Sequence, residues 1–219
     1  MSLIVAIDGP AGAGKSTIAK SVAKKLGAIY VDTGAMYRAM ALHMINNNIS
    51  SDDVDGICKQ CADADISIVY ENGEQVVKLG GQNVNGLIRT EAVGNMASSV
   101  AVHTPVREKM VDLQRQIAKT ADVVMDGRDI GTVVLPHANP KIYLSASSKV
   151  RAERRAAELR AKGEEVDIEV IEKDIIERDY RDMNREVSPL KKADDAIEID
   201  SSYMSIEEVE NAILDLCKR

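Results

Sequence analysis

The chain has 219 residues, 45% of them hydrophobic and 29% charged, and its 28 Lys and Arg against 35 Asp and Glu give a formal charge of −7. These values are typical of one large soluble domain, and they exclude disordered, collagen-like and disulfide-scaffold proteins. The acidic balance argues against a nucleic-acid polymer as partner, because binding one needs a basic face. Neither a membrane-spanning run nor a signal peptide is recognisable, so we expect a cytoplasmic protein with no membrane partner.

Five short apolar runs alternate with amphipathic stretches along the chain. This alternation predicts an α/β protein with a parallel five-stranded sheet that is flanked by helices on both faces. In such sheets, ligands bind beyond the carboxyl ends of the strands. The runs cover residues 2–7, 28–31, 121–125, 141–144 and 196–199, so these ends carry Asp8, Asp32, Asp126 and Ser145.

A glycine-rich segment, residues 9–17, follows the first run and opens a predicted helix that reaches about residue 26. It matches the pattern G-x-x-x-x-G-K-[ST] in the strand, loop and helix context that indicates a P-loop NTPase core. Its small residues let the backbone wrap a phosphate closely with the N–H groups pointing inward. In this pattern Lys15 reaches the β- and γ-phosphates and Ser16 binds Mg²⁺. The predicted ATP-binding residues are Gly9, Pro10, Ala11, Gly12, Ala13, Gly14, Lys15, Ser16 and Thr17.

The region after the second run departs from the parallel pattern. Residues 66–70 and 75–79 are β-prone and lie on either side of Asn72-Gly73, which predicts a β-hairpin. A third short strand is expected at residues 82–84. We therefore predict an antiparallel insert over roughly residues 50–88.

Cys58 and Cys61 in this insert have the spacing of a redox or zinc half-site, but no second cysteine pair accompanies them. The odd total of three cysteines favours a reducing compartment over a disulfide framework. We expect reduced thiols on one turn of a helix.

Two later helix starts are marked by local sequence. Thr104 as N-cap, with Pro105 at the first helical position, predicts a helix that extends to about residue 119. Ser205, with Glu208 three residues later, predicts a capping box at the start of the last helix.

Three further segments carry charges suited to a second phosphate. Thr33 and Arg38 follow the second run, although a capped helix with a solvated arginine fits them equally well. Residues 126–129 (Asp-Gly-Arg-Asp) follow the third run, at the sheet edge where charged residues usually contact a ligand. A predicted helix near the C-terminus places four charged residues on one face, for which an i,i+4 salt-bridge ladder is the alternative. They are Arg178, Arg181, Asp182 and Arg185.

A phosphate loop alone does not separate a kinase from a GTPase or a motor ATPase. No guanine-reading Asn-Lys-x-Asp segment occurs, which disfavours a GTPase. A kinase for UMP, AMP or shikimate is one alternative, and a nucleotide-gated switch with a protein partner at the hairpin is another. An arginine-rich second site favours transfer, because a switch does not need a second phosphate pocket.

The segments GPAGAGKST, VDTGAMYR, MASSVA, PVRE, DGRDIGT and RDYRDMNREVSPL occur in this order across nearly the whole chain. Together they resemble the bacterial cytidylate kinase family of P-loop nucleoside monophosphate kinases. Single motifs are shared with adenylate, shikimate and thymidylate kinases, whereas the insert with DGRDIGT and RDxxRxxxPL resembles cytidylate kinases specifically. The resemblance implies transfer of the γ-phosphoryl group of ATP to CMP or dCMP, giving ADP and CDP or dCDP, in pyrimidine nucleotide metabolism.

The resemblance also implies roles for the residues at matching positions. Those that would read cytosine are Ser98, Arg107 and Asp129. Those that would bind the monophosphate are Thr33, Arg38, Arg128 and Arg185. Asp182 would hold the ribose, with Arg178 nearby. The implied catalytic residues are Lys15, Arg128, Asp129 and Arg185, and Arg154 and Arg155 would bind ATP from a lid helix over residues 151–160.

The implied organisation is a single domain over residues 1–219. The core would comprise residues 1–33, 103–147 and 186–219, and the monophosphate-binding region with its insert residues 34–102. The lid and the helix after it would occupy residues 148–185. Mg²⁺ is expected to accompany ATP, and the enzyme is expected to be a monomer.

Overall fold

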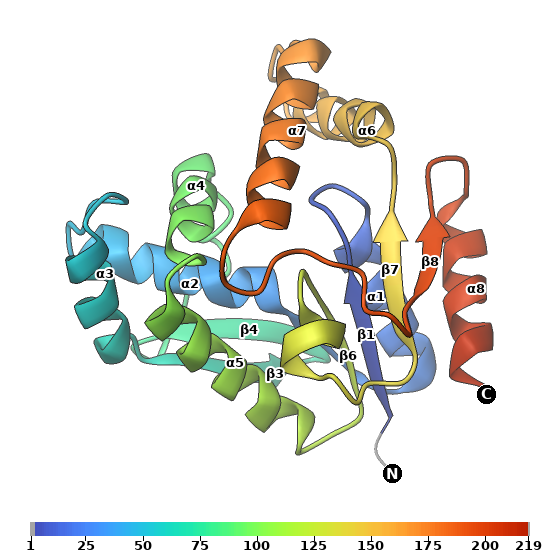
Figure 1. The fold of residues 1–219 in the computed structure, drawn as a ribbon, viewed down its shortest axis with the longest axis horizontal. Coiled ribbons are helices and arrows are strands. Elements are labelled where there is room, and N and C mark those ends of the chain that lie inside the picture. Colours follow the sequence, from blue (N-terminus) through green and yellow to red (C-terminus); the bar gives the residue numbers. More distant parts are fainter. Residues whose placement is uncertain (1–2, 219) are drawn as a thin grey trace. The chain divides into compact units, whose positions relative to one another are not determined.

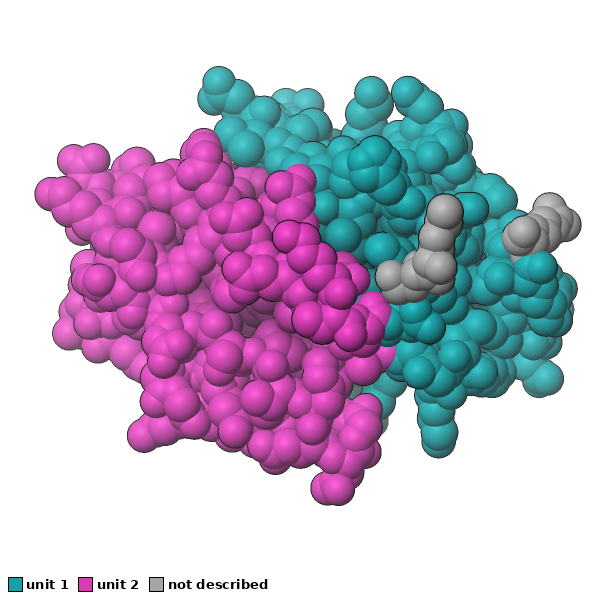
Figure 2. Space-filling model, turned by 90° about the horizontal axis from the view of Figure 1, so that it is seen from below, with its two compact units in different colours: residues 1–28, 122–219 teal, residues 29–121 magenta. Residues whose placement is uncertain are grey.

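The computed structural model describes residues 3–218, which form two compact units. The first unit is made of the described parts of residues 1–28 and 122–219, and the second unit is the segment Ile29–Ala121 between them (Figure 2). The strands form a five-stranded sheet in the order β2-β6-β1-β7-β8 and a three-stranded sheet in the order β3-β4-β5. In the first unit, the strands are β1 (Ile4–Asp8), β6 (Val123–Gly127), β7 (Lys141–Ser145) and β8 (Ile197–Asp200). In the second unit, they are β2 (Ile29–Asp32), β3 (Ile66–Glu71), β4 (Glu74–Leu79) and β5 (Gln82–Asn83).

The four strands of the first unit pair in parallel, β6 with β1, β1 with β7, and β7 with β8. Their β-branched and apolar side chains form the core, and residues 5–7 and 123–125 are fully buried. This parallel pairing confirms the predicted α/β architecture. Parallel strands as hydrophobic as these are typical of sheets that are covered on both faces. In register, Asp8 lies beside Gly127, so the ends of β1 and β6 carry the glycine-rich loop and residues 128–129 side by side.

The helices of the first unit are α1 (Lys15–Leu26), α6 (Ser148–Ala161), α7 (Ile168–Asn184) and α8 (Ile206–Cys217), with a short helical turn η2 (Ile130–Val134) (Figure 1). Helix α1 packs against β1 and β6, and α8 packs against α1. Gly27, in the left-handed conformation, ends α1. The predicted capping box of α8 is confirmed by reciprocal hydrogen bonds between Ser205 and Glu208.

The second unit contains the predicted hairpin, which is confirmed as β3 and β4 joined at Asn72-Gly73, both with positive φ. Its helices are α2 (Thr33–Asn46), α3 (Val54–Gln60), η1 (Cys61–Asp63), α4 (Glu91–Val100) and α5 (Thr104–Ala118). Helix α2 packs against α4 and against β3 and β4. A hydrogen bond from the Tyr70 hydroxyl to the Tyr30 carbonyl (3.1 Å) ties β3 to β2.

Two local predictions in this unit need comment. Thr104 is not the N-cap of α5: the N-cap is His103, and Thr104 is the first helical residue. The proline tolerates this shift by one residue, because either of the first two helical positions accepts a missing N–H. Cys58 and Cys61 are free thiols, as expected, and Cys61 begins η1. None of the helices within residues 3–218 has both the length and the apolar character needed to cross a membrane.

Candidate active site

The glycine-rich loop between β1 and α1 has a backbone that side chains would not permit. A Cβ on Gly9, where φ is +150°, would lie 2.0 Å from the Leu144 carbonyl oxygen. Gly12 and Gly14 also have positive φ, and Gly14 is the N-cap of α1. The loop therefore brings its backbone to the N-terminus of α1, which favours anions.

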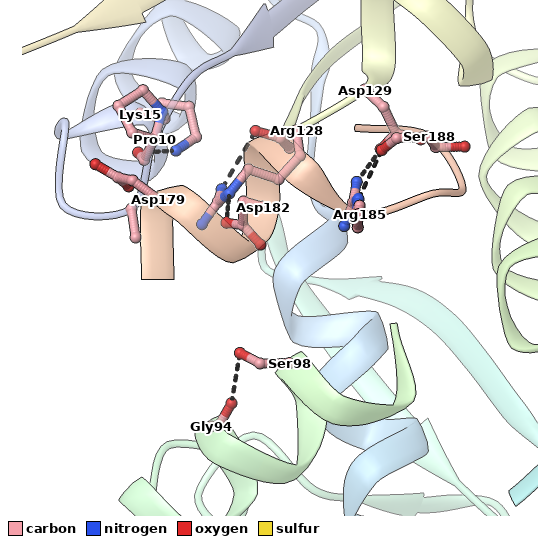
Figure 3. Close-up of polar contacts among 12 residues, drawn as sticks. Pro10, Lys15, Gly94, Ser98, Arg128, Asp129, Asp179, Asp182, Arg185 and Ser188 are labelled. Atoms are coloured by element: carbon pink, nitrogen blue, oxygen red, sulfur yellow. Dashed lines mark hydrogen bonds and ion pairs between the residues drawn. The ribbon is translucent and has the colours of Figure 1, made fainter. Parts of the chain in front are cut away.

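Lys15, the first residue of α1, is only 5% exposed, and its Nζ donates to the Pro10 carbonyl at 2.7 Å (Figure 3). Burial, together with the charge of Arg128, lowers the pKa of Lys15 from 10.5 to about 7. The carboxylates of Asp126 and Asp8 oppose this shift. The loop thus holds a cation at a position that favours the arrival of negative charge.

Ser16 donates its hydroxyl to the Asp126 carboxylate at 3.0 Å. A hydroxyl and a carboxylate oxygen are the hard ligands that Mg²⁺ prefers when substrate phosphates supply the rest of its coordination. No group of three or more His, Cys, Asp or Glu suited to a metal occurs in the described part of the chain. The residues present therefore fit an ion shared with a nucleotide rather than one caged by protein.

Arg128 and Asp182 form an ion pair in which Arg128 Nε donates to Asp182 Oδ2 at 2.9 Å (Figure 3). Burial alone would raise the pKa of Asp182, but the guanidinium of Arg128, with those of Arg178 and Arg185, holds it below the ordinary value. The predicted cluster from the end of β6 and from α7 is thus brought together within the first unit.

Arg185 and Asp129 lie opposite each other at 3.8 Å, and both side chains are 7% exposed. The prediction that Arg185 lies on the helix is wrong. Arg185 is instead the C-cap of α7 and has extended backbone angles. This conformation lets its Nε donate to the Ser188 carbonyl at 2.6 Å. Arg181, which was predicted to share the face of Arg185, is exposed instead.

The arginines of α6 differ from one another in their surroundings. Arg154 donates to the Ser201 carbonyl at 2.7 Å, in the loop after β8. Arg155 is half exposed and donates to Glu158 at 3.1 Å. Both lie in the first unit, which also carries the glycine-rich loop.

The remaining predicted residues lie in the second unit. Thr33 is buried at the start of α2, where the Asp32 side chain accepts from the Ala35 N–H at 2.8 Å. Arg38, later in the same helix, donates to the Ile88 carbonyl at 3.2 Å. A Cβ on Gly94 of α4 would lie 3.0 Å from Arg38 Nη1, so this glycine lets the guanidinium lie against α4.

Ser98 and Arg107 are also held by backbone carbonyls of this unit. The Ser98 hydroxyl donates to the Gly94 carbonyl at 3.3 Å, one turn earlier in α4 (Figure 3). Arg107 is 3% exposed, donates to the Ala101 carbonyl at 3.1 Å, and lies 5.7 Å above the Tyr37 ring. Tyr37 directly precedes Arg38 on α2, so this helix carries both Arg38 and the ring that lies beside Arg107.

The sequence assigns no individual role to two buried charged residues that lie next to the loop. Asp8 accepts from the Ile130 and Gly131 N–H groups, both at 2.7 Å. Arg151 donates to the Ala11 carbonyl of the loop at 2.8 Å and pairs with Asp179 at 2.5 Å. The position of Asp8 at the end of a predicted buried strand was the available signal, whereas nothing local distinguishes Arg151 from its neighbours on α6.

Comparisons with known proteins identify the family of this chain. A family model for cytidylate kinase matches residues 5–219. The cytidylate kinase of Caldicellulosiruptor saccharolyticus is 51% identical over 212 residues, which cover 97% of this chain and 94% of that protein. The cytidylate kinase of Geobacillus sp. (strain WCH70) is 49% identical over 212 residues, covering 97% and 95%. A solved shikimate kinase from Bacteroides thetaiotaomicron shares the fold, with a TM-score of 0.50 and 12% identity over 99% of both chains. The chain belongs to the cytidylate kinase family.

Proposed function

We propose that the chain transfers the γ-phosphoryl group of ATP to CMP or dCMP, giving ADP and CDP or dCDP. Membership of the cytidylate kinase family supports this activity. The structural observation that carries it is the buried Lys15 on the glycine-rich loop, with the charge of Arg128 close enough to lower its pKa. Two neighbouring buried cations repel each other in the empty protein, and phosphate groups bound beside them would offset this repulsion.

Phosphoryl transfer requires little covalent chemistry from the protein. The acceptor phosphate, with a second pKa of about 6, is already largely ionised near neutral pH, so no strong general base is needed. Catalysis then depends on alignment and on positive charge around the transferring group. Arginine suits this task because its planar guanidinium binds two phosphate oxygens and does not lose its proton. Lys15 and Arg154 with Arg155 would serve the donor phosphates, and Arg38, Arg128 and Arg185 the acceptor.

Mg²⁺ would be held by Ser16 and Asp126, and when bound it supplies positive charge that neutralises the phosphates. The hydrogen bond between these two side chains supports this assignment, since it brings the Ser16 and Asp126 oxygens close enough to face one ion together. Lys15, in the same turn of α1, keeps its own charge on the phosphate side.

The choice of base would be made by Asp129 with Ser98 and Arg107. Cytosine presents an exocyclic amine donor where uracil presents a carbonyl acceptor, and a carboxylate favours the first and repels the second. The burial of Asp129 strengthens this preference, because a mismatched base would leave a buried charge without a partner. Asp182 and Arg178 would hold the ribose, and Thr33 would lie beside the phosphate.

We propose the same three regions as above, with residues 34–102 binding the monophosphate and residues 148–185 covering the donor phosphates. We further propose a cytoplasmic monomer whose partners are ATP and CMP or dCMP.

The test is a coupled assay of ADP formation with Mg²⁺ and ATP, offering CMP, dCMP, UMP, AMP, shikimate or no acceptor. We expect fast turnover with CMP and dCMP only. Lys15→Met should abolish transfer, whereas Lys24→Met, at an exposed position of the same helix, should retain it. Fast turnover with AMP or shikimate, or equally fast ATP hydrolysis without any acceptor, would overturn the proposal.

A further inference from the structure

Asp8 is a buried carboxylate that the proposed chemistry does not use. It is the last residue of β1, immediately before the glycine-rich loop, and is 5% exposed. An ionisable group at such a depth is costly unless it is well hydrogen bonded. Its position therefore calls for a reason other than solubility or packing.

Both oxygens of this carboxylate are used to hold one turn of backbone. Oδ1 accepts from the Ile130 N–H and Oδ2 from the Gly131 N–H, each at 2.7 Å. These are the first two residues of η2, and they directly follow Arg128 and Asp129. Charge-assisted hydrogen bonds of this length are roughly twice as strong as neutral ones.

We call the two hydrogen bonds from Ile130 and Gly131 to Asp8 the clamp. Little space is left for a side chain beside it. A Cβ on Gly131 would lie 3.4 Å from Asp8 Oδ2 and 3.1 Å from Lys141 Cδ, so a side chain here would push Lys141 aside next to the Asp8 carboxylate. Asp129, with φ of −144° and ψ of 27°, makes the bend that turns the chain from β6 into η2. The two hydrogen bonds thus fix the chain on the far side of that bend.

The side chains on the near side are those assigned to the acceptor. Arg128 contacts Asp182, and Asp129 faces Arg185. A shift of the bend by about 1 Å would move both, and misplacements of that size can reduce rates by about a hundredfold. Each oxygen of Asp8 thus accepts one N–H of this turn, so the carboxylate is oriented toward the backbone of η2.

We infer that Asp8 is a positioning residue, which sets Arg128 and Asp129 for the acceptor by clamping the N–H groups of Ile130 and Gly131. This inference rests on the proposed function. The inference gives Asp8 a different function from the glycine-rich loop that follows it in sequence. Loss of the clamp should weaken binding of CMP and recognition of its base more than it weakens binding of ATP.

The test is Asp8→Asn, which keeps the size but turns an NH₂ group toward one of the two N–H donors. We expect KM for CMP to rise at least tenfold and the preference for CMP over UMP to narrow. Affinity for a non-hydrolysable Mg-ATP analogue, measured by calorimetry without CMP, should change by less than about threefold. The matched control is Asp122→Asn, since Asp122 also accepts a backbone N–H, from Leu3 at 2.7 Å, but at an exposed site.

A folded Asp8→Asn variant with unchanged KM and base preference would overturn the inference, as would equal losses of ATP and CMP binding. If that variant does not fold, Gly131→Ala, which leaves the carboxylate in place, should give the same selective rise in KM for CMP. Failure of both variants to fold would assign Asp8 to stability alone and overturn its positioning role. A wild-type chain that does not phosphorylate CMP would instead overturn the proposed function, and this inference with it.

Discussion

Lys15 carries its charge where burial and Arg128 both favour the neutral amine, which links folding stability to pH. The unfolded chain keeps this proton up to about pH 10.5, whereas the folded chain releases it near pH 7. Between these values the unfolded state binds more protons, so raising the pH stabilises the fold, by up to about 1.4 kcal/mol per pH unit. Below pH 7 both states are protonated and this contribution is constant.

Lys15→Met should therefore be more stable than the wild type at pH 7, and this advantage should shrink as the pH is raised to 9. The free energy of unfolding in urea at pH 7, 8 and 9 measures the difference. A difference that does not change with pH would show that the lysine is not held with a lowered pKa.

Asp129 is the residue on which discrimination between bases depends in the proposed function. Asp129→Ala should lower kcat/KM for CMP more than for UMP, because only the cytosine amine loses a hydrogen-bond acceptor. The ratio of the two kcat/KM values is the measurement, and it is insensitive to general loss of active protein. An unchanged ratio would remove Asp129 from base recognition.

Helix α4 contributes to the site through the absence of a side chain at Gly94. Gly94→Ala adds a Cβ 3.0 Å from Arg38 Nη1, and the flexible end of the arginine should move away. Alanine in a helix is favoured over glycine by about 0.5–1 kcal/mol, so the fold should be retained. We expect KM for CMP to rise severalfold at nearly constant KM for ATP.

The control for this variant is Gly86→Ala, where an added Cβ meets nothing within 4 Å. Both variants should unfold at the same or higher denaturant concentration than the wild type. If Gly94→Ala kept the wild-type KM for CMP, binding of CMP would not depend on the present position of Arg38 against α4.

Helices α6 and α7 are joined to the glycine-rich loop by Arg151, whose side chain is 6% exposed. Asp179→Ala should destabilise the protein by about 3–5 kcal/mol, because it leaves a buried guanidinium without its carboxylate. Glu158→Ala, which removes the exposed pair with Arg155, should cost less than about 0.5 kcal/mol. Urea unfolding measures the free energy of unfolding of the two variants. Equal losses of stability would show that the buried pair stabilises the fold no more than the exposed pair does.

Elements were predictable from sequence where the signal is local. The strands were found within about two residues, and the hairpin and the last capping box as expected, because alternation, Asn-Gly and Ser-x-x-Glu act over a few residues. Helical spacing continues past Asn184 in the sequence and so predicts Arg185 on the helix, whereas the chain becomes extended at Arg185, whose side chain bonds the Ser188 carbonyl three residues later.

Contacts between distant residues account for what sequence reasoning missed. Asp8 is 122 residues from Ile130, and Arg151 is 140 residues from Ala11, so no periodicity connects either pair. The roles of Lys15 and Ser16 were accessible because the glycine-rich pattern is itself a phosphate-binding structure. The residues of the second site became interpretable only together, through the resemblance to a family.

At the scale of the molecule, the donor and acceptor residues are divided differently between the two units. The glycine-rich loop, Arg154 and Arg155 all belong to the first unit, whereas the proposed acceptor residues come from both. Arg38, Ser98 and Arg107 lie in the second unit, and Arg128, Asp129, Asp182 and Arg185 in the first. Under the proposed function, CMP supplies the anion that the acceptor arginines bind, and ATP alone does not supply it.

Water competes with CMP as the acceptor, and a kinase must suppress that reaction. We expect ATP hydrolysis without CMP to be at least a hundredfold slower than transfer to CMP, because the arginines of the acceptor site are set by an anion that water does not provide. Release of inorganic phosphate, measured with and without CMP at saturating Mg-ATP, gives the ratio. Cytidine, which keeps the base and ribose but lacks the phosphate, should bind without accelerating hydrolysis. If cytidine raised phosphate release to the rate of transfer, the base rather than the phosphate would complete the site, and the arginines would have lost their proposed role.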